Sequence, residues 1–424
     1  MRLLPMSTNT SPSLRMPSEA AQATAGSRFD ADVVVVGGCG HVGLPLGIAL
    51  GQQGMRVVLF DTNQAAVDTV NAGRLPFDED GAQEPLAQLR AGSMLTATTE
   101  PAVIATAEYV VVVIGTPVDE HLNPNPNAVV KAIAQFADHL GRGGQVVVLR
   151  STIYPGVTAL VERYLADRGL HNLVCFCPER IAQGRSMVEL HELPQIISAR
   201  TPEGMAAARR LFSRLAPQLI ELQPEEAELA KLFTNTWRYI RFAAANQLYM
   251  MANDFGLDFE RIRHALVTDY PRAADMPGPG FAAGPCLFKD TMQLAAFNNN
   301  QFTLGHTSMM INEGMPLYVV ARLERRFDLA SMSVGILGTA FKGESDDIRS
   351  SLAYKLKRIL AFKAKNVVCA DPYVKVDPDL VSQEDLIDSV DLVIIGAPHK
   401  RYAGLDIKQP VVDVFNVRKG GVLI

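Results

Sequence analysis

The sequence predicts an α/β protein in which two doubly wound, Rossmann-like domains are joined by a long central helix. Three observations lead to this prediction. A β-branched run at 32–36 precedes a glycine-rich turn and a helical pattern, one helical pattern runs unbroken over about 224–255, and a second series of strand patterns begins at Ser333. A run that is apolar on both faces is typical of a parallel strand covered by helices on both sides.

The size and charge of the chain limit the classes of protein that it can represent. A chain of 424 residues has room for two or three domains of roughly 100–200 residues each. The formal net charge of −5 argues against a basic nucleic-acid-binding face. No apolar run reaches the roughly 18 residues of a membrane-spanning helix. We therefore expect neither a nucleic-acid nor a membrane partner.

The N-terminal segment and the cysteines carry little functional signal. Residues 1–29 are rich in Ser, Thr, Ala and Pro and contain no apolar core of signal-peptide length. We expect a disordered tail or an early start codon, and a cytoplasmic protein. The five cysteines are odd in number and scattered, unlike a disulfide framework. Cys175 and Cys177 form a C-x-C pair without a second pair to complete a metal site, so no metal is expected.

A dinucleotide-binding fingerprint follows the first predicted strand. Gly38, Gly40 and Gly43 form a G-x-G-x-x-G turn that opens a helix, and the next predicted strand ends in Asp61. The glycines let a pyrophosphate approach the helix N-terminus, and the acid is placed to bind the adenosine ribose. Because no arginine follows Asp61 to receive a 2′-phosphate, NAD is predicted rather than NADP. The alternative is a glycine-rich turn without a ligand.

Three more predicted strands end in polar loops. These loops contain Thr116, Thr152 and Glu179. Ligands bind beyond the carboxyl ends of the strands in an open parallel sheet, so we expect these residues and Asp61 to gather at one edge. Taken singly, either threonine is equally well explained as a helix cap, and Glu179 as a surface acid.

The long helical pattern begins at Pro224 and carries an apolar stripe that includes Leu232, Phe233, Leu248 and Met251. At 1.5 Å per residue it is on the order of 45 Å long, so we expect it to bridge two domains and to pair with its copy in a homodimer.

Two polar residues stand four positions apart on this helical pattern. Lys231 and Asn235 therefore share one face of the helix. A cation and an amide one turn apart suit a developing oxyanion. The alternative is a solvated lysine beside a polar neighbour.

One cysteine ends a loop that is rich in glycine and proline. Residues 278–290 read GPGFAAGPCLFKD, and a helical pattern begins directly after Cys286. We expect Cys286 in the first helical turn, where free N–H groups and the helix dipole favour a thiolate, with Lys289 adding positive charge. A thiolate in a loop of this kind suits covalent attack on a carbonyl. The alternative is a small, inert core residue.

The second βα series opens at Ser333 and has no G-x-G-x-x-G motif. A second dinucleotide is therefore not expected. Lys342 follows the first strand of this series, where it could hold a phosphorylated ligand and face the first domain across a cleft.

These segments together resemble the UDP-glucose/GDP-mannose dehydrogenase family of nucleotide-sugar 6-dehydrogenases, over about residues 31–416. The matching motifs, in order, are GCGHVGLP, LPFDEDG, GTP, STIYPG, CPERIAQG, AELAKLFTN, PGPGFAAGPCLFKD and FKGESDDIRSS. The predicted domains are a disordered tail (1–29), an NAD-binding Rossmann domain (30–215), a central helical and dimerisation domain with the cysteine loop (216–328), and a C-terminal UDP-sugar-binding domain (329–424).

The resemblance implies a four-electron oxidation of the C6 hydroxyl of a UDP-hexose to the uronate, with two NAD⁺ and one water, for polysaccharide precursor synthesis. It implies a thiohemiacetal and a thioester on Cys286. The implied catalytic residues are Cys286, Lys231, Asn235, Glu179, Asp290 and Thr152. The implied cofactor-binding residues are Gly38, Gly40, His41, Val42, Gly43, Asp61, Thr116, Thr152 and Arg349. The implied substrate-binding residues are Glu179, Arg180, Lys231, Asn235, Gly280, Gly284, Phe341, Lys342 and, from a partner subunit, Arg272.

Several positions depart from the family pattern and concern the sugar rather than the reaction. Ala283-Gly284-Pro285 replaces a frequent Gly-Gly-Ser, Gln183 replaces a frequent acid, and Phe415 or Asn416 stands where UDP-glucose enzymes tend to carry an arginine. The PERI and PGPG motifs favour a UDP-N-acetylhexosamine, whereas the Lys-Asp pair after the cysteine favours UDP-glucose.

Two rival functions remain open from the sequence. A two-electron NAD-dependent dehydrogenase of 6-phosphogluconate or 3-hydroxyacid type would share the architecture and need no cysteine. A catalytically silent NAD-binding regulator would have kept the fold alone, but the presence of Cys286, Lys231, Asn235, Glu179 and Asp290 argues against it.

Overall fold

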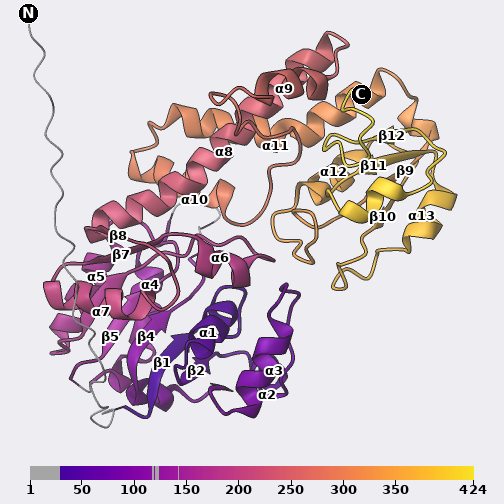
Figure 1. Ribbon diagram of the computed structural model, residues 1–424. Helices are drawn as coiled ribbons and strands as arrows, with labels where there is room; N and C mark the ends of the chain where they lie inside the picture. Colours follow the sequence, from indigo (N-terminus) through magenta and orange to yellow (C-terminus); the bar gives the residue numbers. More distant parts are fainter. Residues whose placement is uncertain (1–28, 117–118, 120–123, 142) are drawn as a thin grey trace, which may run out of the picture.

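The computed structural model describes residues 29–116, 119, 124–141 and 143–424. In that part of the chain, eight strands form the first sheet in the order β3-β2-β1-β4-β5-β6-β7-β8 (Figure 1). Its strands are β1 (Ala31–Val36), β2 (Val57–Phe60), β3 (Leu95–Thr98), β4 (Ala107–Val112), β5 (Val146–Leu149), β6 (Leu173–Phe176), β7 (Gln195–Ala199) and β8 (Leu219–Leu222). The helices between them are α1 (Gly43–Gln52), α2 (Gln64–Asn71), α3 (Gln83–Ala91), α4 (Asn127–Ala134), α5 (Val157–Asp167), α6 (Ser186–Glu192) and α7 (Pro202–Phe212).

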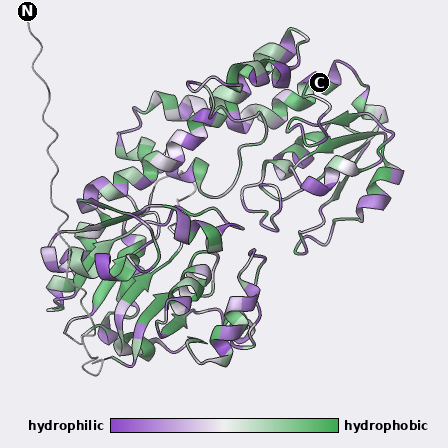
Figure 2. Ribbon diagram, viewed as in Figure 1, coloured by the Kyte–Doolittle hydropathy of each residue, from purple (hydrophilic) through white to green (hydrophobic). Residues whose placement is uncertain are grey.

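The first sheet is buried on both faces, as the β-branched run predicts. Val33 and Val35 of β1 lie in one hydrophobic cluster, and Val34 and Val36 in another on the opposite face, because successive side chains of a strand alternate. Figure 2 shows the strands as the most hydrophobic part of this domain. The sheet is parallel except that β7 runs antiparallel to β6, an exception that the strand patterns did not predict.

A single helix, α8 (Pro224–Asp254), leads away from the first sheet toward the other end of the molecule (Figure 1). Its 31 residues span roughly 46 Å. Gln223 and Glu226 form a capping box at its start, and Pro224 occupies the first turn. α8 packs against α10 (Leu287–Phe297) and α11 (Thr303–Glu324), and α9 (Phe259–Val267) follows it.

The predicted apolar stripe of α8 does not form one buried face within the chain. Leu232 is fully buried, whereas Phe233, Leu248 and Met251 are exposed. Polar residues of α8, among them Lys231 and Asn235, face the interior of the protein, so part of the apolar pattern lies outside.

The last domain is a smaller parallel sheet with strand order β10-β9-β11-β12 in the residues that the structure describes. It comprises β9 (Ser333–Leu337), α12 (Leu352–Leu360), β10 (Asn366–Ala370), α13 (Gln383–Ser389), β11 (Leu392–Ile395) and β12 (Val411–Val412). The predicted architecture of two Rossmann-like units joined by a long helix is therefore confirmed.

Within the described ranges, no helix is long and apolar enough to cross a membrane. The same ranges contain no group of three or more His, Cys, Asp or Glu side chains that could hold a metal ion. Cys175 and Cys177 are both buried in the core.

Candidate active site

The glycine-rich turn between β1 and α1 packs too closely for side chains. A Cβ at Gly38 would lie 2.7 Å from the Cβ of Leu59, and a Cβ at Gly43 would lie 2.5 Å from the carbonyl oxygen of Gly37. Gly40, by contrast, has only that carbonyl oxygen within 4 Å. The absence of side chains lets a phosphate approach the N-terminus of α1, where backbone N–H groups are free.

Asp61 lies directly after β2 and faces this turn. Its Oδ2 accepts a hydrogen bond from the N–H of Cys39 at 3.0 Å, and its Oδ1 accepts one from the N–H of Asn63 at 3.0 Å. Asp61 also lines a cavity of about 180 Å³ whose walls, among the described residues, include no cation. The cavity residues are Val36, Gly37, Phe60, Asp61, Thr62, Ile114, Ala132, Gln135 and Phe136. A carboxylate beside a glycine turn, without a cation for a 2′-phosphate, fits the adenosine half of NAD.

Two residues of the predicted sheet edge meet as expected. The hydroxyl of Thr116 donates a 2.6 Å hydrogen bond to the carbonyl of Thr152. Lys289, on α10, donates to the hydroxyl of Thr116 at 3.4 Å. The edge of the first sheet is thus connected to the helix that follows the cysteine.

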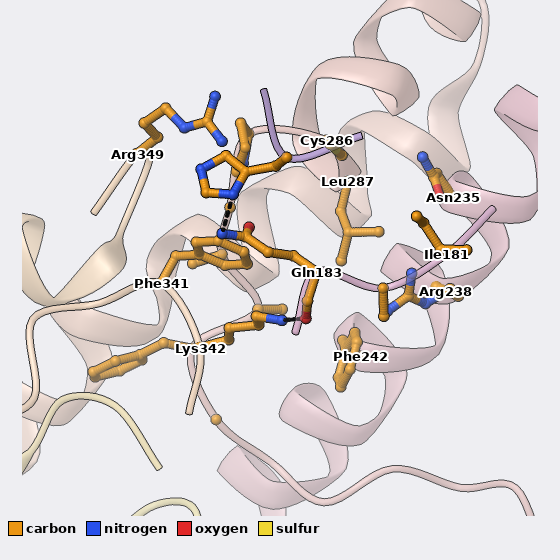
Figure 3. Close-up of a pocket in the computed structure, with 18 of the residues that line it drawn as sticks. Ile181, Gln183, Asn235, Arg238, Phe242, Cys286, Leu287, Phe341, Lys342 and Arg349 are labelled. Carbon is orange, nitrogen blue, oxygen red and sulfur yellow. Dashed lines mark hydrogen bonds between the residues drawn. The ribbon is translucent and has the colours of Figure 1, made fainter. Parts of the chain in front are cut away.

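A larger cavity, of about 410 Å³, lies between the first domain, α8, the cysteine loop and the last domain (Figure 3). It brings together residues that the sequence places more than 300 positions apart. The predicted site residues that line it are His41, Val42, Arg180, Lys231, Asn235, Gly280, Gly284, Cys286, Phe341, Lys342 and Arg349.

One face of α8 lines this cavity with Lys231, Asn235, Arg238 and Phe242. Lys231 and Asn235 are 9% and 5% exposed, so the alternative of a solvated lysine is wrong. Burial lowers the pKa of Lys231, while the charges of Asp290, Cys286 and Glu179 act to raise it.

Cys286 is the N-cap residue of α10 rather than a residue of its first turn. It is solvent-exposed, so it is not the inert core residue of the alternative reading. The expectation of a favoured thiolate is wrong for this structure. Surrounding protein atoms raise the pKa of the Cys286 thiol, and Asp290 raises it further. Lys289, Lys231 and Arg349 act to lower it, but desolvation and the carboxylate outweigh them.

Asp290 lies one turn into α10 and is completely buried. Its Oδ2 accepts a 2.5 Å hydrogen bond from the side-chain amide of Asn235. Its Oδ1 lies 2.8 Å from the ammonium of Lys289. This carboxylate therefore joins the cysteine helix to the face of α8 that lines the cavity.

Glu179 and Thr152 do not line the cavity. The Glu179 carboxylate is bound by the guanidinium of Arg150, which is fully buried, and by the N–H groups of Arg180 and Ile181 at 2.7 and 3.0 Å. These contacts fix the loop after β6. The surface-acid alternative for Glu179 is therefore wrong, because only 9% of the residue is exposed.

Two glycines of the cysteine loop let the loop pack closely against the last domain and α8. Gly284 has a φ of +105°, and a Cβ there would lie 2.6 Å from the ring of Phe341. A Cβ at Gly280, with a φ of +147°, would lie 2.5 Å from the ring of Phe415. The N–H and the carbonyl of Gly280 bond to the side-chain amide of Asn246 on α8 at 2.9 and 3.0 Å.

Gln183 connects the loops of the two α/β domains. The side-chain amide nitrogen of Gln183 lies 3.2 Å from Nδ1 of His41. The backbone carbonyl of Gln183 accepts a hydrogen bond from the ammonium of Lys342 (Figure 3). The rings of His41 and Phe77 contact each other in a tilted arrangement, with centroids 4.0 Å apart. Burial lowers the pKa of both His41 and Lys342.

The three remaining predicted arginines have different surroundings. Arg349 lines the cavity and pairs with Asp347 at 2.6 Å. Arg180 lines it too, and its guanidinium donates to the carbonyl of Pro194. Arg272 is exposed, lies beside the ring of Tyr270, and is not among the cavity residues of its own chain.

Comparison with known proteins decides the family. Three models of the UDP-glucose/GDP-mannose dehydrogenase family match the chain: the NAD binding domain at 31–216, the central domain at 225–313 and the UDP binding domain at 335–419. The chain belongs to the UDP-glucose/GDP-mannose dehydrogenase family. It is an NAD-dependent nucleotide-sugar dehydrogenase.

Individual relatives are similar over most of their length. UDP-N-acetyl-D-mannosamine dehydrogenase of Pyrococcus horikoshii is 28% identical over 386 residues, which are 88% of this chain and 91% of the relative. NDP-N-acetyl-D-galactosaminuronic acid dehydrogenase of Ralstonia solanacearum is 28% identical over 402 residues, which are 89% of this chain and 93% of that relative. The structure of a UDP-glucose dehydrogenase from Pyrobaculum islandicum matches with a TM-score of 0.85 and 26% identity, over 94% of this chain and 97% of that one.

Sequence reasoning missed several residues of this dehydrogenase's site. Arg238 and Phe242 follow Lys231 and Asn235 on the same face of α8, and the helical spacing could have found them. Asp371 of the last domain was not predicted either, and it does not line the cavity. It accepts hydrogen bonds from the N–H groups of Thr339 and Ala340 at 2.6 and 3.0 Å, and Nε2 of His399 lies 3.1 Å from it.

Asp371 corresponds in position to Asp61 of the first domain. Each acid follows the strand after its glycine-containing loop and binds backbone N–H groups of that loop. Burial acts to raise the pKa of Asp371, but hydrogen bonds from His399 and the loop hold it below its usual range. Its position directly after the strand at 366–370 is the feature of the sequence that could have indicated Asp371.

Proposed function

We propose that the protein oxidises the C6 hydroxyl of a UDP-hexose to the uronate in two NAD⁺-dependent steps, through a covalent intermediate on Cys286. The observation that carries the proposal is the single cavity that Cys286, Lys231 and Asn235 share with residues of both α/β domains. The overall reaction consumes one alcohol, two NAD⁺ and one water, and it yields one carboxylate, two NADH and three protons.

In the first oxidation, Lys231 and Asn235 bind the C6 oxygen and stabilise the negative charge that develops on it. Their burial supports this role, because charge stabilisation is stronger where water is excluded. Bound NAD⁺ accepts a hydride in each of the two oxidation steps. The hydroxyl proton passes to a water that Asp290 holds. Lys289 and Thr116 keep the cysteine helix against the cofactor domain.

In the second oxidation, the sulfur of Cys286 adds to the aldehyde carbon and forms a thiohemiacetal. The raised pKa of this thiol requires a base at this step, and Asp290 takes the proton. Asn235 and Lys231 hold the resulting oxyanion. Loss of the second hydride converts the thiohemiacetal into a thioester.

Hydrolysis releases the product. Water attacks the thioester carbonyl, Asn235 and Lys231 hold the tetrahedral oxyanion, and the thiolate of Cys286 leaves. Glu179 and Thr152 contribute by fixing the loops at the edge of the first sheet, since Glu179 is engaged by Arg150 and two backbone N–H groups.

The last domain binds the nucleotide. Phe341 and Lys342 line the cavity on that side, and the family's UDP binding domain covers this segment. We place UDP-N-acetylhexosamines first among the substrates, because relatives with these sugars in their names match most of the chain. UDP-glucose is the second candidate because of the match to the Pyrobaculum islandicum enzyme.

A homodimer completes the proposed site. Phe233 and Trp237 are 52% and 58% exposed on α8, and large exposed apolar surfaces commonly mark protein interfaces. We propose that α8 pairs with its copy and that Arg272, which lies outside the cavity of its own chain, reaches the substrate of the partner subunit.

The direct test is turnover of a panel of UDP- and GDP-hexoses with NAD⁺. We expect NADH with a UDP-hexose, and two NADH for each uronate formed. One NADH per substrate, or a product that stops at an aldehyde or ketone, would favour the two-electron dehydrogenase. No turnover with any sugar, despite NAD binding, would favour the regulator.

A further inference from the structure

The charged residues that line the large cavity are all basic. Among its lining residues in the described chain are Arg180, Lys231, Arg238, Lys342 and Arg349, and no Asp or Glu. Like charges that share a cavity repel each other more strongly than in bulk water. The cavity therefore favours a ligand that carries more than one negative charge.

Arg238 differs from the other arginines of this lining. Arg349 is paired with Asp347, and Arg180 donates to the carbonyl of Pro194. The guanidinium of Arg238 makes no hydrogen bond or ion pair with any residue that the structure describes, and the residue is exposed. Its five N–H donors are therefore available to a ligand.

The position of Arg238 on α8 relates it to the reacting carbon. It follows Asn235 by three residues and Lys231 by seven, which is about 4.5 and 10.5 Å along the helix axis. A hexose with C6 beside Lys231 and Asn235 extends over about one further turn of this helix. Arg238 then faces the end of the hexose that carries the nucleotide.

Lys342 approaches the same region from the last domain. Its ammonium donates to the carbonyl of Gln183, and Figure 3 shows Arg238 on the other side of that residue. Burial is the main cause of the lowered pKa of Lys342; Glu79, Asp347 and Glu189 act to raise this pKa, and the positive charge of Arg238 acts to lower it. Two cations from different domains therefore line one cavity, and the described lining of this cavity contains no acid.

We propose that Arg238 binds the sugar-linked phosphate of the nucleotide diphosphate, facing Lys342 across it. This inference deepens the proposed function and rests on it. A guanidinium matches two phosphate oxygens with a pair of parallel hydrogen bonds. The phosphate also relieves the repulsion between Arg238 and Lys342, which a neutral sugar hydroxyl or amide would not do.

The test compares UDP with UMP, which lacks the sugar-linked phosphate, by isothermal titration calorimetry. The charge-assisted bonds of one guanidinium correspond to roughly tenfold or more in affinity. For Arg238→Gln we expect UDP to bind at least about tenfold more weakly, while UMP affinity changes by less than about threefold. Arg238→Lys should bind UDP with intermediate affinity.

Arg241→Gln is the matched control. Arg241 lies on the same helix, pairs with Asp275 at 3.1 Å, and does not line the cavity. Its substitution should leave both affinities unchanged.

An unchanged ratio of UMP to UDP affinity in Arg238→Gln would overturn the inference, and so would a variant that weakens binding of the UDP-sugar but not of UDP. Wild-type protein that does not bind UDP would instead contradict the proposed function, and the inference with it.

Discussion

The side-chain amide of Asn235 donates a 2.5 Å hydrogen bond to Oδ2 of Asp290, and both residues are buried. This bond links α8 to the helix that follows Cys286. An asparagine amide has two N–H donors, so the carboxylate orients the group by one donor and leaves the other for a substrate oxygen. In the proposed mechanism, this bond preorganises Asn235 as an oxyanion donor.

Removal of this donor should slow catalysis more than it weakens binding. For Asn235→Ala we expect kcat to fall by about 10²–10³, the typical cost of one oxyanion donor. Thr234→Ala is the control, because the hydroxyl of Thr234 donates a hydrogen bond to the carbonyl of Ala230 within the same helix. Steady-state kinetics check the prediction. A variant with wild-type kcat and a raised KM would show that Asn235 only binds substrate.

Cofactor choice should depend on Asp61. Its carboxylate lines a cavity whose described walls include no cation, and a 2′-phosphate would meet a like charge there. We expect at least about a tenfold preference for NAD⁺ over NADP⁺ in kcat/KM, about 1.4 kcal/mol, and a smaller preference in Asp61→Ser. Equal or better kcat/KM with NADP⁺ in the wild type would be incompatible with this role.

Gly284 should not tolerate a side chain. A Cβ at Gly284 would lie 2.6 Å from the ring of Phe341, and its φ of +105° is strained for alanine. We expect Gly284→Ala to lower the free energy of unfolding by roughly 1–3 kcal/mol and to weaken UDP binding. Gly278→Ala is the matched control, because a Cβ at Gly278 has nothing within 4 Å. Equal melting temperatures for the two variants would contradict the prediction.

The raised pKa of Cys286 predicts how thiol alkylation depends on pH. Only the thiolate is nucleophilic, and desolvation by the surrounding protein atoms together with Asp290 disfavours it. The rate of inactivation by iodoacetamide should therefore rise through alkaline pH, with a midpoint above that of an ordinary thiol. Asp290→Asn removes the neighbouring negative charge and should move the midpoint down. A wild-type midpoint below neutral pH would mean that Lys231 and Lys289 dominate instead.

The regular parts of the fold could be predicted because local patterns determine them. The alternation of Val33 to Val36 between two cores, the glycine turn before α1 and the end of α8 just before Gly256 all follow from residue type and spacing. The position of Asp61 directly after β2 was predictable for the same reason. The antiparallel β7 was not, because its direction depends on the path of the chain after β6 and not on its own sequence.

The electrostatics of the site could not be predicted from the spacing of residues in the sequence. The helix dipole and Lys289 predict a thiolate at Cys286, but the desolvation and the carboxylate of Asp290 that outweigh them arise only when α8, α10 and the loops pack together. The partner of Glu179 could not be foreseen either, since Arg150 precedes it by 29 residues and directly follows another strand, β5. Arg238 was overlooked although the spacing from Asn235 indicates a shared face.

The central claim is that Cys286 carries the second oxidation, and the number of NADH per sugar acid in Cys286→Ala tests it most directly. The wild type should release two NADH per uronate. The alanine variant should complete the first hydride transfer and stop at the aldehyde or its hydrate, with one NADH per substrate and turnover to the acid reduced by orders of magnitude. An alanine variant that still makes uronic acid with two NADH at near wild-type rate would contradict the account.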